Sequence, residues 1–588
     1  MGYRCTQARW LAGSLLITIA GCGGPPASVP GAAAPQPQAA AHDRWPEFAA
    51  RFIEEYFKAH PFFAAQAGRH EFDGQMDDVS AAGIAAEVAR LQRLRPEAEG
   101  FDSAALTPDE RFEREYLLTV IDGDLYWLER ARFPFTNPAW YIDRLDPDVY
   151  LNRDYAPLPQ RMQGYIGYAR AIPKIAADIR ANLHTPLAPT FIERGISGFG
   201  GFADFFRKDV AKVFAAVADP AAQKELAEAN LAAAAAMDGL KSWLQGERKR
   251  ATGQFALGEP LFLEMLKTTE RVEVPIAQLL ALGRADLERN TQALQAACSQ
   301  YLPHATLRAC VHRMDVDQPA GGPVEGARRQ LSDLRAFIVA HQIVTLPSDE
   351  QALVAEAPPY NRANAAYINV PGPYEKGVAY TYNIAPPDPS WTARERAAYI
   401  PGKAKLLYTS VHEVWPGHFL QFLYANRNPS KVAALWVGYA YAEGWAHYSE
   451  EMMWEEGLGN GDPEQHVGQL VEALLRNVRF LSAIGLHTQG MTVQESDKMF
   501  RERGYLDAGN ARQQAARGTY DPGYLKYALG KLMIRKLRAD WLAQQAGAAA
   551  STDPKQYWHA FHDKFLSFGG PPIPLVRKAM VGEGGSLL

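Results

Sequence analysis

The sequence has few cysteines, no excess of charge of one sign, and no apolar run as long as a typical membrane-spanning helix. Four cysteines occur among 588 residues, and 61 basic side chains stand against 66 acidic ones, for a formal net charge of −5. Without a basic excess, a nucleic-acid partner is not expected. With 47% hydrophobic residues, the chain can instead bury the sizeable core of a globular protein.

The short apolar run near the N-terminus is typical of a targeting segment. Arg4 and Arg9 precede the apolar residues 10–20, which are too few to span a bilayer, and Cys22 follows soon after. The run Ile-Ala-Gly-Cys resembles a bacterial lipobox, whose cysteine is lipidated after cleavage. Because Gly23 rather than an aspartate follows the cysteine, the resemblance implies an anchor in the outer membrane. The alternative is a plain secretory signal with an incidental cysteine.

The segment after this cysteine reads as a tether. Residues 22–42 are rich in Ala, Pro and Gly and carry almost no charge, which is typical of a flexible linker. We therefore expect a signal peptide over 1–21, a lipidated cysteine and tether over 22–42, and a folded part over 43–588. The membrane would be a partner through the lipid anchor only.

Two cysteines remain for the folded part. Cys5 and Cys22 belong to the N-terminal leader, which leaves Cys298 and Cys310. An exported compartment is oxidising, so the sequence predicts a disulfide between these two. The alternative is a pair of buried thiols.

Helical patterns dominate the folded part, so we expect a mainly α-helical protein. Thr107, Pro108 and Glu110 occupy the positions of an N-cap, a first helical residue and a capping-box partner. We expect an N-terminal helical lobe over about 43–320 and a catalytic lobe over about 321–588. The long helices predicted from these signals and from apolar periodicity cover 43–57, 107–127, 159–185, 219–248 and 274–298.

Two segments depart from the helical texture. Residues 197–202 are glycine-rich but lack the spacing that cradles a phosphate, so they predict a tight turn near a cleft. Residues 377–384 alternate β-branched and aromatic side chains, which predicts a strand. Such a strand can form a sheet edge along which a peptide lies, with Tyr382 and Asn383 as candidate substrate contacts. The alternative is a short structural hairpin.

The strongest chemical signal is the run HEVWPGH at 412–418. His412 and His418 offer imidazole ligands and Glu413 a general base, the residue types that a catalytic zinc site uses. Six residues of regular helix would turn the two histidines about 120° apart. Pro416 and Gly417 can form a local bulge that returns His418 to the metal side. The alternative is a helix that ends at this point and leaves two ordinary histidines.

A third ligand is expected from the run AEGWAHYSEE. Glu443 lies 25 residues beyond His418, far enough for the next helix to return past the first. His447, one turn later, either orients a ligand or is itself a ligand, and Gln421 is a second candidate for orienting a ligand. Glu450 and the adjacent Glu451 are predicted to be solvated.

Two later segments hold further candidates. Arg476 and Arg479 share a helix face and could hold a substrate carboxylate, or form a surface ion-pair network. His487 follows on the same segment as a candidate catalytic residue. Tyr524 and Tyr527 are candidates for a phenol that stabilises an oxyanion, although structural tyrosines are common.

These runs together resemble a known family. HEVWPGHFLQ, AEGWAHYSEE, the R-x-x-R…GLH run at 476–487 and Y-x-x-G at 527–530 are similar, in this order, to the bacterial domain-of-unknown-function 885 family. That family is similar to Glu-zincin peptidases such as thimet oligopeptidase and angiotensin-converting enzyme. The resemblance implies a large helical, zincin-like domain with a deep cleft and a small β-sheet edge near the active site.

The same resemblance implies roles for individual residues. His412, His418 and Glu443 would bind one Zn²⁺, Glu413 would be the base, and Tyr527 or Tyr524 would stabilise the oxyanion. We therefore expect a lipid-anchored zinc metallopeptidase that cleaves short peptides at the periplasmic face of the outer membrane. The alternatives are a non-peptide zinc hydrolase at the same site and a non-enzymatic lipoprotein that binds peptides or another envelope protein.

Overall fold

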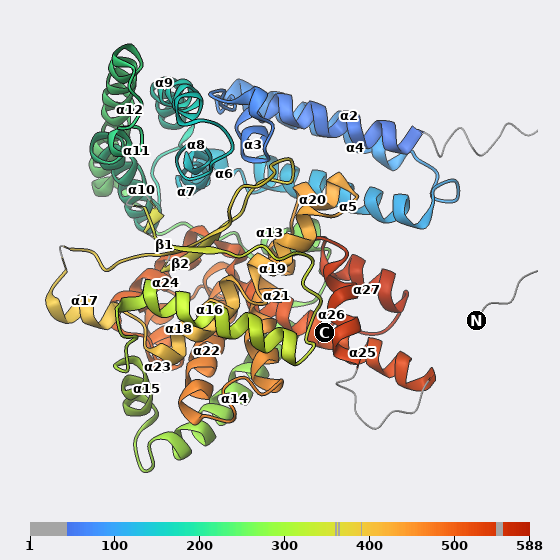
Figure 1. The fold of residues 1–588 in the computed structure, drawn as a ribbon. Coiled ribbons are helices and arrows are strands. Elements are labelled where there is room, and N and C mark those ends of the chain that lie inside the picture. Colours follow the sequence, from blue (N-terminus) through green and yellow to red (C-terminus); the bar gives the residue numbers. More distant parts are fainter. Residues whose placement is uncertain (1–43, 359–360, 363–364, 390, 549–556) are drawn as a thin grey trace, which may run out of the picture.

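The computed structural model describes residues 44–358, 361–362, 365–389, 391–548 and 557–588. Its fold is mainly α-helical with one small sheet, which confirms the predicted fold class (Figure 1). The signal peptide, Cys22 and the tether lie outside the described residues. Among the residues described, no helix is long and apolar enough to cross a membrane.

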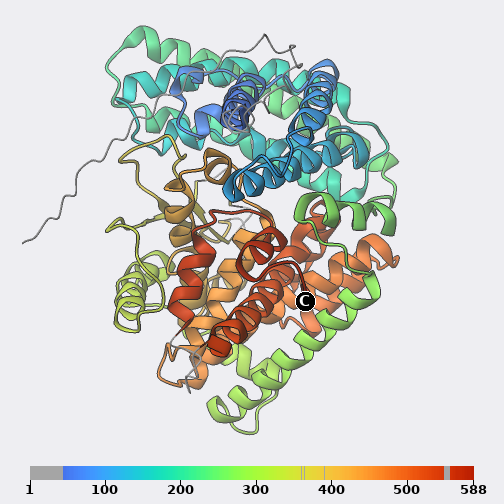
Figure 2. The same ribbon diagram turned by 90° about the vertical axis from the view of Figure 1, so that its right-hand side faces the viewer.

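The N-terminal half consists of helices that form the upper part of the molecule in both ribbon views (Figures 1 and 2). The predicted long helices are confirmed, and Thr107 and Glu110 form the expected capping box. The helices and turns of this half are α2 Arg44–Ala59, α3 Pro61–Gln66, η1 His70–Phe72, α4 Ala81–Glu99, α5 Pro108–Leu125, η2 Tyr126–Arg130, α6 Phe133–Thr136, α7 Ala139–Ile142, η3 Asp143–Leu145, α8 Asp148–Leu151, α9 Leu158–Asn182, α10 Pro189–Lys208, α11 Val210–Val213, α12 Pro220–Glu247 and η4 Arg248–Arg250.

The predicted turn at 197–202 is wrong, because these residues lie inside helix α10. A side chain at Gly198 would overlap Ile142, and one at Gly200 would lie 3.1 Å from the Lys241 side chain of α12. Glycine here lets α10 approach its neighbours closely. The glycines therefore serve helix packing, which local sequence does not distinguish from a turn.

The C-terminal half carries the candidate site and lies below the first in Figure 1. Its core takes in buried side chains of α14, α21, α22 and α25, among others. Its helices are α13 Glu259–Glu270, α14 Ile276–Tyr301, α15 Leu307–Asp315, α16 Gly322–Ala340, α17 Ala393–Tyr399, α18 Lys403–Glu413, α19 His418–Asn426, α20 Lys431–Leu435, α21 Tyr439–Glu455, α22 Pro463–Thr488, α23 Val493–Glu502, α24 Ala508–Tyr520, η6 Pro522–Leu525, α25 Lys526–Ala548, α26 Trp558–Leu566 and α27 Ile573–Val581.

The division between the halves comes earlier than the expected boundary near residue 320. One apolar cluster holds buried residues between Phe62 and Leu244, whereas the largest cluster takes in α13, α14 and nearly everything after them. Helices α13 to α16 therefore pack with the site-bearing half. A third cluster joins α2, α4 and α5 to α20 and so connects the two halves.

The sheet has three strands in the order β1-β3-β2. Strand β3 (Thr381–Ile384) pairs in parallel with β1 (Leu353–Glu356) and antiparallel with β2 (Ala366–Asn369), and Tyr382 lies opposite both Val354 and Ile368. The predicted strand is therefore present but short. Its expected place at a free sheet edge is wrong, because both of its edges are already hydrogen-bonded.

The predicted pairing of Cys298 and Cys310 is confirmed. The two sulfur atoms form a disulfide between α14 and α15, at a sequence separation of 12 residues. Both side chains are buried. The bond fastens the turn between these helices and lies outside the candidate site.

Candidate metal centre

The two histidines are brought together by a break between two helices. Helix α18 ends at Glu413 and α19 begins at His418, with a cis Trp415–Pro416 bond between them. The predicted bulge in one continuous helix is therefore wrong. The alternative prediction, that the helix ends here, is confirmed. Its second part, that His412 and His418 are two unrelated histidines, is wrong, because the two side chains lie close together.

Gly417 makes this break possible through a close approach of backbone to backbone. Its N–H donates a hydrogen bond to the Val411 carbonyl at 2.9 Å. A Cβ atom at this position would overlap the carbonyl group of His412. Since only glycine lacks that atom, the chain can fold back here and start α19 beside the end of α18.

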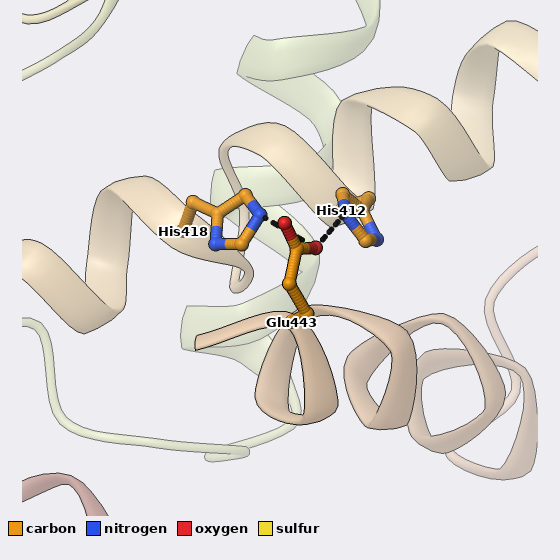
Figure 3. Close-up of side chains that lie close together, drawn as sticks. All are labelled: His412, His418 and Glu443. Atoms are coloured by element: carbon orange, nitrogen blue, oxygen red, sulfur yellow. Dashed lines mark hydrogen bonds and ion pairs between the residues drawn. The ribbon is translucent and has the colours of Figure 1, made fainter. Parts of the chain in front are cut away.

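Glu443 from α21 completes a cluster of three potential ligands (Figure 3). Its Oε2 lies 3.2 Å from His412 Nε2 and 3.4 Å from His418 Nε2. Zinc bonds of 2.0–2.1 Å in a tetrahedron place neighbouring ligand atoms about 3.3 Å apart. The two distances to Glu443 match this spacing, all three ligand atoms lie within 4.8 Å of one another, and two imidazoles with a carboxylate are donors that suit zinc.

The cluster is held in a buried, charged environment. His412 and His418 are 4% and 8% exposed. Burial lowers the pKa of His412, but hydrogen bonds with Glu443 and Glu450 outweigh it and raise that pKa to about 9. Burial raises the pKa of Glu443, and the two histidines bring it well below the usual value. Glu443 is therefore ionised, as a metal ligand must be.

Glu450 stands behind His412, and the prediction that it is solvated is wrong. It is fully buried and accepts a hydrogen bond from His412 Nδ1 at 2.6 Å. This contact leaves His412 Nε2 facing the cluster, the arrangement in which a carboxylate orients a metal-bound histidine. Glu450 lies seven residues after Glu443 and hence on the same side of α21, a signal that could have identified it.

The neighbouring Glu451 is also buried rather than solvated. It forms ion pairs with Lys531 at 3.2 Å and with Arg535 at 2.8 Å. These pairs lock α21 against α25 and do not involve the cluster.

Glu413 is a buried carboxylate next to the first ligand. It is 7% exposed, and burial raises its pKa, although the positive charges of His412 and His418 act in the opposite direction. A carboxylate with a raised pKa accepts a proton more readily than one on the surface. Its position and its pKa therefore suit a general base.

The two candidate tyrosines differ in position. The ring of Tyr527 stacks on His412, with 6.2 Å between ring centroids. The hydroxyl of Tyr524 instead donates to Ser482 Oγ at 2.9 Å, inside the core. The structure therefore brings Tyr527 to the cluster and leaves Tyr524 in a packing role.

His447 and Gln421 lie outside the cluster itself. His447 is fully buried and donates from Nδ1 to Glu450 at 3.2 Å, so it contacts the carboxylate that orients His412. Gln421 donates to the Gly569 carbonyl at 2.9 Å and ties α19 to the C-terminal segment. Neither is among the grouped ligand atoms.

His487 is held by backbone groups away from the cluster. Its Nε2 donates to the Gly518 carbonyl at 2.8 Å, and its Nδ1 accepts from the Leu257 N–H at 3.3 Å. Burial lowers its pKa to about 4, so the ring is neutral. With both nitrogens engaged, His487 has no free atom for proton transfer in this arrangement.

The two arginines of α22 have different partners. Arg476 pairs with Glu450 at 3.3 Å and also with Glu472, so its charge is neutralised inside the protein. Arg479 donates to Gln514 at 2.8 Å and lies over the ring of Tyr527. The ion-pair network that was the alternative prediction is buried rather than on the surface. It includes Arg476 but not Arg479, whose hydrogen-bond partner Gln514 is neutral.

Tyr382 and Asn383 are buried in the central strand. Tyr382 is fully buried; burial raises its pKa, and the charge of Glu413 raises it further. Asn383 is 3% exposed and donates to the Thr381 carbonyl at 3.1 Å. Strand β3 thus lies beside the base, but these side chains are packed rather than open to solvent.

A cavity of about 270 Å³ lies between the two halves. Side chains between Trp127 and Arg194 line it from the N-terminal half, and side chains between Tyr439 and Lys526, together with Asn361, line it from the C-terminal half. Tyr439 belongs to this lining and lies one helical turn before Glu443. The ring of Tyr439 packs against that of Tyr527, with 5.8 Å between ring centroids, so the cavity borders the surroundings of the cluster rather than its ligands.

The comparisons with known proteins identify a family and a fold. The sequence profile of a family described as "Bacterial protein of unknown function (DUF885)" matches residues 61–580. None of the curated proteins compared with the sequence matches it.

Two solved structures share the fold. One, described as a candidate lipoprotein of unknown function from Shewanella oneidensis, has a TM-score of 0.73 at 23% identity and covers 91% of this chain and 99% of that one. The other, a candidate lipoprotein from Colwellia psychrerythraea, has a TM-score of 0.74 at 19% identity and covers 92% and 98%. At these identities the likeness establishes the fold alone.

Proposed function

This chain belongs to the DUF885 family of bacterial proteins of unknown function, and we propose that it is a zinc-dependent hydrolase that cleaves short peptides. The observation that carries the proposal is the cluster of His412, His418 and Glu443, whose ligand atoms all lie within 4.8 Å of one another. The buried carboxylate of Glu413 lies beside the cluster. A structural zinc site needs ligands only, whereas a hydrolytic site also needs a base for the attacking water, so Glu413 favours a hydrolytic site.

The chemistry divides between the metal and the protein. Zinc bound by these three side chains would acidify a water molecule and polarise the scissile carbonyl. Glu413 takes a proton from the attacking water, whose oxygen bonds to the carbonyl carbon. The phenol of Tyr527 donates a hydrogen bond to the oxygen that becomes negative. Glu413 then passes the proton to the amine nitrogen as the C–N bond breaks, so one water and one peptide bond yield a carboxylic acid and an amine.

The proposed location is the bacterial envelope. The lipobox-like run ending at Cys22 supports a lipid anchor, and Gly23 supports the periplasmic face of the outer membrane. The two solved structures of this fold are also described as candidate lipoproteins. A peptidase at this position would act on peptides of the periplasm.

The test compares the wild type with Glu413→Gln at matched zinc content. We expect about one zinc per chain in both, because Glu413 is not among the grouped ligands. Hydrolysis of tri- to decapeptides should fall roughly 10²–10⁴-fold in the variant, the contribution of a positioned general base. Equal activity in the two proteins would remove Glu413 as the base. A zinc-loaded wild type without peptide turnover would leave a non-peptide hydrolase or a peptide-binding lipoprotein.

A further inference from the structure

Arg479 is a buried cation whose charge is not neutralised inside the protein. Its side chain is 7% exposed, and its Nε donates to the neutral Gln514 at 2.8 Å. No carboxylate forms an ion pair with it anywhere in the described part of the chain. Burial lowers the pKa of Arg479, and the positive charges of Arg517 and Arg476 lower it further, while the phenols of Tyr527 and Tyr439 act in the opposite direction. The protein thus places a guanidinium among other cations and away from water.

The neighbouring arginines, unlike Arg479, do form ion pairs with carboxylates. Arg476 pairs with Glu450 and Glu472, and Arg517 pairs with Asp521 at 3.0 Å. An unpaired buried charge is energetically unfavourable unless an opposite charge joins it. A ligand that brings an anion would therefore be bound at Arg479.

Arg479 is also close to the proposed reaction site. Its guanidinium lies 4.7 Å from the centre of the Tyr527 ring, and the same ring stacks on His412. Gln514, which holds Arg479, lines the cavity of about 270 Å³. Arg517 lines the same cavity and donates to the Tyr527 hydroxyl at 3.4 Å. One aromatic side chain therefore separates the candidate anion site from the cluster.

We infer that Arg479 receives a carboxylate of the substrate, so that the enzyme prefers peptides with a carboxylate one or two residues from the bond that is cleaved. This inference rests on the proposed peptidase function. Consecutive Cα atoms are 3.8 Å apart, so an anion one side chain away from the cluster belongs to a nearby residue. A guanidinium binds a planar carboxylate through two parallel hydrogen bonds. Either a C-terminal carboxylate or an acidic side chain has this chemistry.

The experiment measures kcat/KM for N-acetylated tetrapeptides. One uncharged sequence is used with a free and with an amidated C-terminus, and a third, amidated peptide carries Glu at the last position. We expect the wild type to prefer a peptide with a carboxylate over the uncharged amide by about 10²-fold. Preference for the free C-terminus or for the Glu side chain identifies the source of the carboxylate.

Variants then assign the preference to Arg479. Arg479→Gln should bring the ratio close to one, and Arg479→Lys should keep part of it, because lysine retains the charge but loses the two parallel hydrogen bonds. Arg512→Gln makes the same charge change at an exposed position of α24 and should leave the ratio unchanged. An unchanged ratio in Arg479→Gln, or an equal loss of rate for all three peptides, would overturn the inference.

Two further results keep this inference separate from the proposed function. The wild-type comparison of the three peptides stands even where Arg479→Gln fails to fold, and absence of any preference overturns the inference. Equilibrium binding of the same peptides to Glu413→Gln needs no turnover. If the carboxylate peptides bind selectively but the wild type does not hydrolyse them, the peptidase proposal is contradicted and the anion site is supported. If the wild type hydrolyses all three peptides without selectivity, the anion site is contradicted and the peptidase proposal is supported.

Discussion

Glu413 and Glu450 are buried carboxylates near the same imidazole, and their surroundings give them opposite properties. Burial raises the pKa of Glu413. Burial also disfavours the charged form of Glu450, but Arg476, His447 and the hydrogen bond from His412 outweigh it and lower its pKa. Glu413 is thus suited to take up a proton, whereas Glu450 remains ionised. Two carboxyl groups whose pKa values are shifted in opposite directions are typical of catalytic sites in which one accepts a proton and the other stays charged.

At the residue scale, Glu450→Gln should weaken metal binding. The amide keeps the shape of the side chain but removes the charge that accepts the His412 Nδ1 hydrogen at 2.6 Å. Loss of such a supporting group typically lowers metal affinity roughly 10–100-fold. A zinc titration against a competing chelator measures the effect. Glu502→Gln, at an exposed position at the end of α23, should match the wild type, and an unchanged affinity in Glu450→Gln would show that Glu450 does not support His412.

At the scale of elements, the junction of α18 and α19 decides whether the site exists. The ligands His412 and His418 lie on two different helices, and Glu443 on a third. The turn between the first two depends on the contact of Gly417 with the backbone of residues 411 and 412. The site is therefore as sensitive to this glycine as to its ligands.

Gly417→Ala should accordingly reduce both stability and zinc binding. The added methyl group would overlap the His412 carbonyl, and overpacking of this kind typically costs about 1–3 kcal/mol. Denaturant unfolding and metal analysis are the measurements. Gly239→Ala is the matched control, because nothing lies within 4 Å of a Cβ atom at this position inside α12. A Gly417→Ala protein with full stability and full zinc would contradict this account of the junction.

At the scale of the whole molecule, the two halves have separate tasks. All three candidate ligands belong to the C-terminal half, while Trp127, Trp140 and Arg194 from the N-terminal half line the cavity between the halves. Contacts such as the hydrogen bond from the Tyr116 hydroxyl to the Gly570 carbonyl, at 3.0 Å, join the halves. This division predicts that metal binding depends on side chains of the C-terminal half.

Zinc should stabilise the folded protein because it would join three helices that are separate in sequence. At a free zinc concentration 100-fold above Kd, the gain is about 2.7 kcal/mol for one site. Thermal unfolding of metal-free protein with and without added zinc measures it, and chelation should reverse it. Glu443→Gln should lose most of the response. A zinc effect of equal size in wild type and Glu443→Gln would indicate binding elsewhere.

The sequence by itself determined the mainly helical class, several helix starts and the disulfide partners. Each of these depends on local chemistry, as in the capping box of Thr107 and Glu110, or on a short list of candidates, as for Cys298 and Cys310. The runs at 412–418 and 443–450 also marked the region of the site. Residue type and spacing sufficed there because ligand chemistry restricts the choice to a few side chains.

Only the tertiary structure decided which candidates meet. The burial of Glu450 depends on Arg476, 26 residues later, and the choice of Tyr527 over Tyr524 depends on which ring reaches His412. Likewise, Arg476 and Arg479 occupy the same helix face, yet only the first meets carboxylates from other turns and helices. These contacts depend on how helices far apart in the sequence pack against one another, and a local sequence pattern does not determine that packing.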